Sequence, residues 1–124
     1  MSPRSEEFMA AAREWLGGAR ATLSSGFAPG AVSLAYYAML YAARAALSEE
    51  DRYAKTHSGT WNLFRETFVV TGKFNETIFE HAQGTLPLRM AADYEARQVS
   101  TDDAEAIVEL AESFLDAIET LFPD

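Results

Sequence analysis

The residues best suited to chemistry lie in one short segment, Leu88-Arg89-Met90-Ala91-Ala92-Asp93-Tyr94. The segment combines a cation, an anion and a phenol in an otherwise apolar stretch. Arg89 and Asp93 are four residues apart, so on a helix they share a face, and Tyr94 lies about 140° round from Arg89. This spacing permits a small polar site. It equally permits an ion pair, within the helix or between helices, beside a buried tyrosine.

A second polar cluster is Lys55-Thr56-His57-Ser58-Gly59, at the expected start of a helix. A lysine, a histidine and the free N–H groups of a helix start could together hold a phosphate or a carboxylate. The alternative is a capped helix start with solvated side chains. Arg52 precedes His57 with an Arg-x4-His spacing, and the isolated His81 is expected on the surface.

The composition predicts one packed domain over residues 1–124. The chain is 48% hydrophobic and 12% aromatic, and it has no cysteine. It therefore lacks disulfides, thiolate zinc sites and cysteine nucleophiles, which agrees with a reducing compartment. Residues 1–7 are polar and acidic with no apolar run behind them, so we expect no signal peptide and a cytoplasmic location.

The charge of the chain is unevenly distributed. The net charge is -9, yet residues 100–124 hold eight acids and no Lys or Arg. Broad binding to nucleic acid needs a basic field, so no DNA partner is expected. A compact RNA or nucleotide site elsewhere in the chain remains compatible with this distribution.

Several other functions are disfavoured by the sequence. The apolar run 31–47 is shorter than the ~20 residues that span a bilayer, so it predicts a buried helix and no membrane contact. Its one cation, Arg44, needs an acidic partner or a route to solvent. The two histidines are distant, and no paired Glu-x-x-His motif or glycine-rich phosphate loop occurs. We therefore expect no metal and no cofactor.

The elements that must position these residues are all helical. Apolar residues recur at helical spacing, and no alternating strand pattern appears. The expected helices start at Pro3 or Ser5, at Pro29 (ending near Leu47), after a cap at Ser58, after a cap at Asn75, and after a cap at Ser100 or Thr101. The fourth is interrupted over 84–87, and its second half would carry Arg89. The fold class is all-α: an up-and-down bundle of four long helices plus one shorter helix.

One local feature conflicts with the first helix. Gly17-Gly18 lies in its middle, where each glycine costs about 1 kcal/mol relative to alanine. Close approach of another backbone would explain the pair.

Three segments together resemble a known family. They are Ala35-Tyr36-Tyr37-Ala38-Met39-Leu40-Tyr41-Ala42-Ala43-Arg44-Ala45-Ala46-Leu47, then Lys55-Thr56-His57-Ser58-Gly59, then Leu88-Arg89-Met90-Ala91-Ala92-Asp93-Tyr94. In this order the chain resembles the HEPN domain (higher eukaryotes and prokaryotes nucleotide-binding), in its small stand-alone prokaryotic form. The resemblance implies a helical bundle that dimerises and a toxin-like protein paired with a minimal nucleotidyltransferase.

The resemblance also implies a type of site. Active members are metal-independent ribonucleases with an Arg-x4–6-His motif at the dimer interface, where arginine steadies a phosphate and histidine moves protons. Arg89 fits the arginine of this motif, but Tyr94 stands where the histidine is expected. A tyrosine, with a pKa near 10, is a poor base at pH 7, although it could donate a hydrogen bond or bind a nucleotide. His57 could instead complete a composite site with Arg89, and we interpret the Arg52–His57 match as coincidental.

The sequence thus leaves three hypotheses. The first is a nucleotide- or RNA-related module paired with a minimal nucleotidyltransferase, which binds its ligand through Lys55, His57, Arg89, Asp93 and Tyr94. The second is a metal-independent ribonuclease toxin with Arg89 and either His57 or Tyr94 as the catalytic pair. The third is a structural homodimer without a ligand, in which Arg89 and Asp93 are an ion pair.

Overall fold

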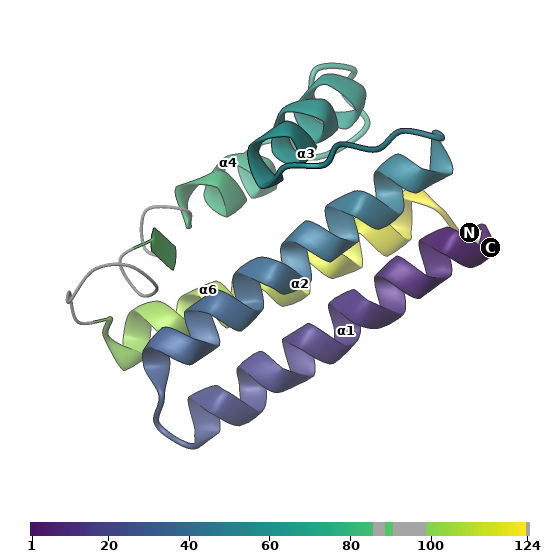
Figure 1. The fold of residues 1–124 in the computed structure, drawn as a ribbon. Coiled ribbons are helices and arrows are strands. Elements are labelled where there is room, and N and C mark those ends of the chain that lie inside the picture. Colours follow the sequence, from purple (N-terminus) through teal and green to yellow (C-terminus); the bar gives the residue numbers. More distant parts are fainter. Residues whose placement is uncertain (86–88, 91–98, 124) are drawn as a thin grey trace.

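A computed structural model describes residues 1–85, 89–90 and 99–123. These residues form helices and no strand, so the predicted all-α fold is confirmed (Figure 1). In chain order the elements are α1 (Pro3–Ser24), α2 (Ala28–Glu49), α3 (His57–Phe64), η1 (Arg65–Val69), α4 (Glu76–Gly84) and α6 (Thr101–Leu121). Asp93 and Tyr94 lie outside the described residues.

The centre of the bundle is α2. It forms an antiparallel hairpin with α1 and packs against α6 on another side (Figure 1). On a third side it contacts α3. Seven of its alanines are fully buried and allow neighbouring helices to approach closely: Ala31, Ala35, Ala38, Ala42, Ala43, Ala45 and Ala46. The expected buried helix is therefore confirmed. None of the described helices combines the length and the apolar character that a bilayer crossing requires.

The helix starts follow capping chemistry, with one difference from the sequence prediction. Asn75 and Ser100 cap α4 and α6 as expected. The predicted cap of α3 at Ser58 is wrong: Thr56 is the cap, and its Oγ1 accepts a hydrogen bond from the Gly59 N–H at 2.9 Å. A cap bonds the N–H two or three residues ahead, so the helix starts at His57, one residue before the predicted cap.

The glycine pair in α1 does not meet another backbone in the described structure. A Cβ on Gly17 would meet no atom within 4 Å. A Cβ on Gly18 would lie 3.6 Å from Leu34 Cδ1, an ordinary contact. The close approach predicted from the sequence is therefore wrong for these residues.

An aromatic core fixes α3 against the rest of the bundle. Trp61 and Phe64 of α3 meet Phe79 of α4 and Phe114 of α6, with ring centroids 5.7 to 6.4 Å apart. The helix continues into the π-helical turn η1, in which the Val70 N–H donates to the Arg65 carbonyl. This packing holds the first turn of α3, and with it His57, beside α2.

Candidate functional site

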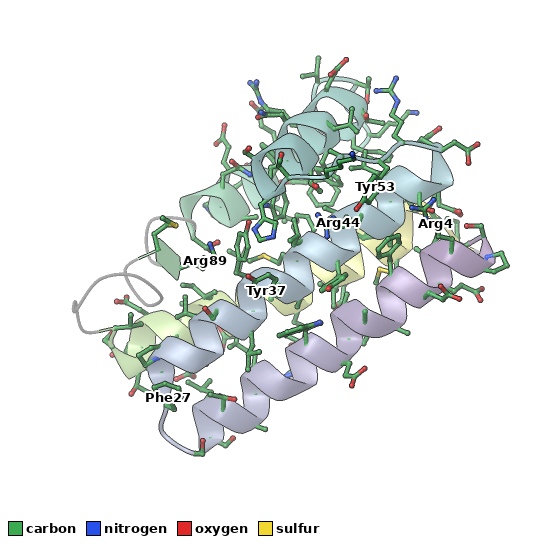
Figure 2. The ribbon with its side chains drawn as sticks, viewed as in Figure 1. Arg4, Phe27, Tyr37, Arg44, Tyr53 and Arg89 are labelled. Atoms are coloured by element: carbon green, nitrogen blue, oxygen red, sulfur yellow. The ribbon has the colours of Figure 1, made fainter. Side chains whose placement is uncertain are left out.

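Arg89 is a buried arginine held by two tyrosines of α2. Its exposed fraction is 7%, and its Cζ lies 4.9 Å from the ring centroid of Tyr36 and 5.4 Å from that of Tyr37. Its Nη2 donates a hydrogen bond to the Tyr37 hydroxyl at 3.0 Å. Figure 2 shows the side chains of Arg89 and Tyr37 near each other beside α2. Cation–π contact of this kind stabilises a desolvated guanidinium by about 2 kcal/mol.

His57 approaches the same two tyrosines from α3. Its ring centroid lies 5.9 Å from that of Tyr36 and 5.7 Å from that of Tyr37. The buried Trp61 Nε1 donates to the Tyr36 hydroxyl at 3.1 Å, which ties this turn of α3 to α2. Two predicted site residues, distant in sequence, thus share one pair of aromatic rings.

A cavity of about 350 Å³ opens between these elements. Its lining combines a cation, aromatic rings and neutral polar groups: Tyr36, His57, Ser58, Trp61, Asn62, Gln83 and Arg89. No carboxylate is among these described lining residues. The volume is within the range of small-ligand sites.

The electrostatics of the cavity favour an anion. Burial is the largest cause that lowers the pKa of His57, and the positive charges of Arg89 and Arg44 lower it further. The histidine is therefore neutral near pH 7. Burial also raises the pKa of Tyr36, against the opposing effects of its bond from Trp61 and the nearby arginines. A site with fixed cations and neutral hydrogen-bonding groups suits a phosphate or carboxylate.

Arg44 lies farther along α2 and does not line the cavity. Its Nε is buried and makes no hydrogen bond to any described residue, and no described carboxylate pairs with it. Its Cζ lies 5.8 Å from the ring centroid of Tyr53. Of the two alternatives predicted for this arginine, partial exposure to solvent is the one seen among the described residues.

The other predicted residues lie elsewhere. Lys55 is exposed and does not line the cavity. Arg52 is also exposed and donates to Thr67 Oγ1 at 3.1 Å, so the Arg-x4-His pair is not brought together in the cavity. His81 is exposed, as expected.

Sequence reasoning missed the residues that hold Arg89. A signal was present, because adjacent tyrosines in an apolar helix need partners for their hydroxyls. Their partners, Trp61 for Tyr36 and Arg89 for Tyr37, come from segments far along the chain. Asn62 and Gln83 gave no signal, since isolated amides occur on any helix surface.

Comparison with known proteins identifies the family of the chain. The family model described as "HEPN domain" matches residues 5–121, and the chain belongs to that family. A "UPF0332 protein" of Thermotoga maritima is 33% identical over 91% of this chain and 86% of its own length. A "UPF0332 protein" of Gloeobacter violaceus is 31% identical over 91% of this chain and 90% of its own length.

An archaeal relative bears a functional name. "Putative toxin MJ0142" of Methanocaldococcus jannaschii is 31% identical over 68% of this chain. The matched region spans 58% of that protein's length.

Proposed function

We propose that this HEPN protein is a toxin-like module that binds the phosphate of a nucleotide or of RNA in the cavity between Arg89 and His57. The observation that carries the proposal is the buried guanidinium of Arg89, seated on Tyr36 and Tyr37 at the wall of a cavity that His57 also lines. The toxin-like role rests on the name of an archaeal relative.

The binding geometry follows from the chemistry of the lining. A guanidinium presents its N–H donors in a rigid plane that matches two phosphate oxygens, and the bond to Tyr37 fixes the direction of that plane. The neutral His57 can accept or donate one hydrogen bond. Ser58, Asn62 and Gln83 supply hydroxyl and amide groups for a sugar or a base.

Titration of the protein with uridine monophosphate, followed by NMR, tests this function. In the wild type we expect the ligand to change the NMR chemical shifts of His57 and Trp61 most. In Arg89→Ala we expect these chemical-shift changes to disappear. Arg89→Lys keeps the charge without the planar fork and should bind more weakly than the wild type. Arg52→Gln, which removes an exposed arginine outside the cavity, is the matched control. Wild-type affinity in a folded Arg89→Ala variant would contradict the proposal.

A second candidate function is metal-independent cleavage of RNA. It is favoured by the lowered pKa of His57, which leaves the ring neutral and able to accept a proton at pH 7. In this mechanism His57 accepts the proton of a ribose 2′-hydroxyl as its oxygen attacks the adjacent phosphorus. The bond from that phosphorus to the 5′-oxygen of the next nucleotide breaks, and the 5′-oxygen takes a proton from water. Arg89 stabilises the charge on the phosphate oxygens. Tyr94 stays the predicted alternative to His57 in the catalytic pair, and Asp93 a predicted partner of Arg89.

Cleavage of single-stranded RNA in the presence of EDTA tests this second candidate. Activity should disappear in His57→Gln and in Arg89→Ala, and expression of the wild type alone should arrest growth of a host. If the wild type binds uridine monophosphate but does not cleave RNA, the cleavage candidate is rejected and the phosphate-binding function stands.

The partners implied by the family are also proposals. We expect a homodimer, measurable by sedimentation, and a complex with a minimal nucleotidyltransferase, measurable by co-purification. Failure of the two proteins to co-purify would remove the pairing without affecting the phosphate site.

A further inference from the structure

A second cationic group lies along α2 from the Arg89 cavity. Arg44 follows Tyr37 by seven residues on the same helix, which is about 10 Å along the helix axis. Its Nε is buried without a hydrogen-bond partner in the described part of the chain. A buried donor that is left unpaired is costly, and the side chain of Arg44 is only partly covered, so an anion beside its exposed part would stabilise the guanidinium charge.

Tyr53 joins Arg44 to another arginine. The Cζ of Arg44 lies 5.8 Å from the centroid of the Tyr53 ring, and the Cζ of Arg4 lies 5.5 Å from the same centroid. Tyr53 itself is 54% exposed. Neither arginine pairs with a described carboxylate. Two guanidinium groups therefore gather at one ring that is open to solvent.

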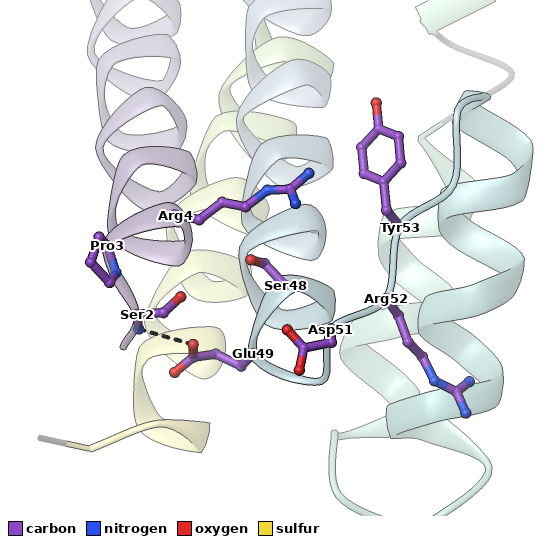
Figure 3. Close-up of a pocket in the computed structure, with 8 residues that line it drawn as sticks. All are labelled: Ser2, Pro3, Arg4, Ser48, Glu49, Asp51, Arg52 and Tyr53. Atoms are coloured by element: carbon purple, nitrogen blue, oxygen red, sulfur yellow. Dashed lines mark hydrogen bonds between the residues drawn. The ribbon is translucent and has the colours of Figure 1, made fainter.

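The acids near Arg4 are on its other side. Glu49 accepts hydrogen bonds from the Ser2 N–H and the Ser5 hydroxyl, and Asp51 lines the cavity next to it. Figure 3 shows Arg4 reaching toward Tyr53, away from both carboxylates, while Arg52 points in the opposite direction. An anion near Tyr53 is thus best placed on the side of Arg44, toward the Arg89 cavity.

We propose that Arg4, Arg44 and Tyr53 form a second phosphate subsite, which holds a later phosphate of the same single-stranded oligonucleotide whose first phosphate is bound by Arg89. The proposal rests on the proposed function, because it extends the ligand of that site. Figure 2 shows the five side chains Arg89, Tyr37, Arg44, Tyr53 and Arg4 following one another along this face of the molecule.

The length of the ligand follows from the helix. The rise of about 10 Å along α2 from Tyr37, which holds Arg89, to Arg44 corresponds to about three nucleotide steps at ~3.4 Å each. A mononucleotide is too short to reach both groups. The subsite therefore selects for chain length, whereas the cavity selects for a phosphate.

Two ligands separate the subsite from the cavity: uridine monophosphate and a 2′-O-methyl hexauridylate, whose blocked hydroxyls prevent cleavage. The wild type should bind the hexamer at least about tenfold more tightly, as one added charge-assisted hydrogen bond implies. At 0.15 M salt the Debye length is about 8 Å, so the charge of Arg44, which does not line the cavity, is largely screened from a ligand there. In Arg44→Gln at this salt concentration the advantage of the hexamer should disappear, while the affinity for uridine monophosphate stays within about twofold. For the hexamer, the slope of log K against log salt should become shallower by about 0.7, one phosphate contact.

The control variants make each outcome decisive. Tyr53→Ala should act like Arg44→Gln, and Arg52→Gln should act like the wild type. Arg89→Ala should weaken the binding of both ligands. If it weakens the binding of neither, the proposed function itself fails. If the cavity binds uridine monophosphate but Arg44→Gln changes both affinities equally, or neither, the subsite is overturned and the proposed function stands.

A second copy of the chain is the competing occupant of this face. In that case Tyr53→Ala and Arg44→Gln would shift the sedimentation coefficient toward a smaller species without any effect that depends on ligand length. That result would also overturn the subsite.

Discussion

Arg89 carries a permanent charge at a position where only 7% of its surface meets solvent. The aromatic faces of Tyr36 and Tyr37 and the Tyr37 hydroxyl partly replace the lost hydration. This arrangement is expensive to build for packing alone, since an apolar side chain would fill the same space at lower cost. It is well suited to a site in which a fixed cation meets an anion.

The Trp61–Tyr36 bond gives a prediction at the same scale. Tyr36→Phe leaves the buried Trp61 N–H without an acceptor, so it should lower the free energy of unfolding by about 1–3 kcal/mol. Tyr41→Phe, on the same helix and with no hydroxyl bond among the described residues, should change it by less than about 0.5 kcal/mol. Urea denaturation of the two variants measures the difference. Equal values would mean that the bond contributes nothing.

The pKa of His57 gives a prediction about pH. The folded protein disfavours the protonated ring, so its folded pKa lies below the ordinary 6.5. The unfolded chain therefore binds more protons as pH falls through 6.5, and stability is lost below that pH. The free energy of unfolding should drop between pH 8 and pH 5.5 in the wild type and drop less in His57→Gln. NMR titration of the ring gives the pKa directly, and a value above 6.5 would contradict the assignment.

The start of α3 gives a prediction at the scale of elements. Thr56→Ala removes the hydroxyl that accepts the Gly59 N–H, and should lower the free energy of unfolding by about 1 kcal/mol. Ser58→Ala, at the position the sequence pattern suggested, should have almost no effect. Thermal denaturation compares the two variants. The reverse order would place the helix start at Ser58.

The open surface at Gly17 gives a second prediction for an element. A methyl group there would meet no described atom within 4 Å, so Gly17→Ala should stabilise α1 by up to about 1 kcal/mol. Gly18→Ala should stabilise α1 by a similar amount, because Leu34 lies at an ordinary contact distance from the added methyl group. A loss of stability that depends on protein concentration would instead show that another chain packs on this part of α1.

The helices themselves were predictable because they depend on local patterns. Apolar spacing and the caps Asn75 and Ser100 mark their positions along the chain. The wrong cap at Ser58 shows the limit, since Thr56 and Ser58 are both good capping residues and packing decides between them. The site was half predictable: Arg89 and His57 stand out by type, but their meeting on Tyr36 and Tyr37 depends on how α2 and α3 pack.

Acidic side chains gather on α6 in the described part of the chain. Arg13 and Arg20 of α1 pair with acids of α6, namely Asp116, Glu119 and Glu112. Other acids of α6, such as Glu105 and Glu109, are exposed. The arginines Arg4, Arg44 and Arg89 lie along the side of α2 that Figure 2 shows. An approaching polyanion is therefore repelled by the exposed acids of α6 and attracted at close range by the arginines near α2.

This charge distribution predicts a salt-dependent effect on ligand binding. In the double variant Glu105→Gln, Glu109→Gln, the affinity for hexauridylate should change by less than about twofold at 0.15 M salt, where the Debye length is about 8 Å. At 0.01 M salt, with a Debye length of about 30 Å, the double variant should bind more tightly than the wild type. Fluorescence anisotropy at the two salt concentrations measures this. A large effect at high salt would mean that α6 contacts the ligand directly.

The placement of the two tryptophans has a practical consequence. Trp61 lines the cavity, and Trp15 lies 5.3 Å from Tyr37, the tyrosine that Arg89 bonds. The chain has no other tryptophan. Its intrinsic fluorescence therefore originates beside the proposed phosphate site, so ligand occupancy can be followed optically in the unlabelled protein.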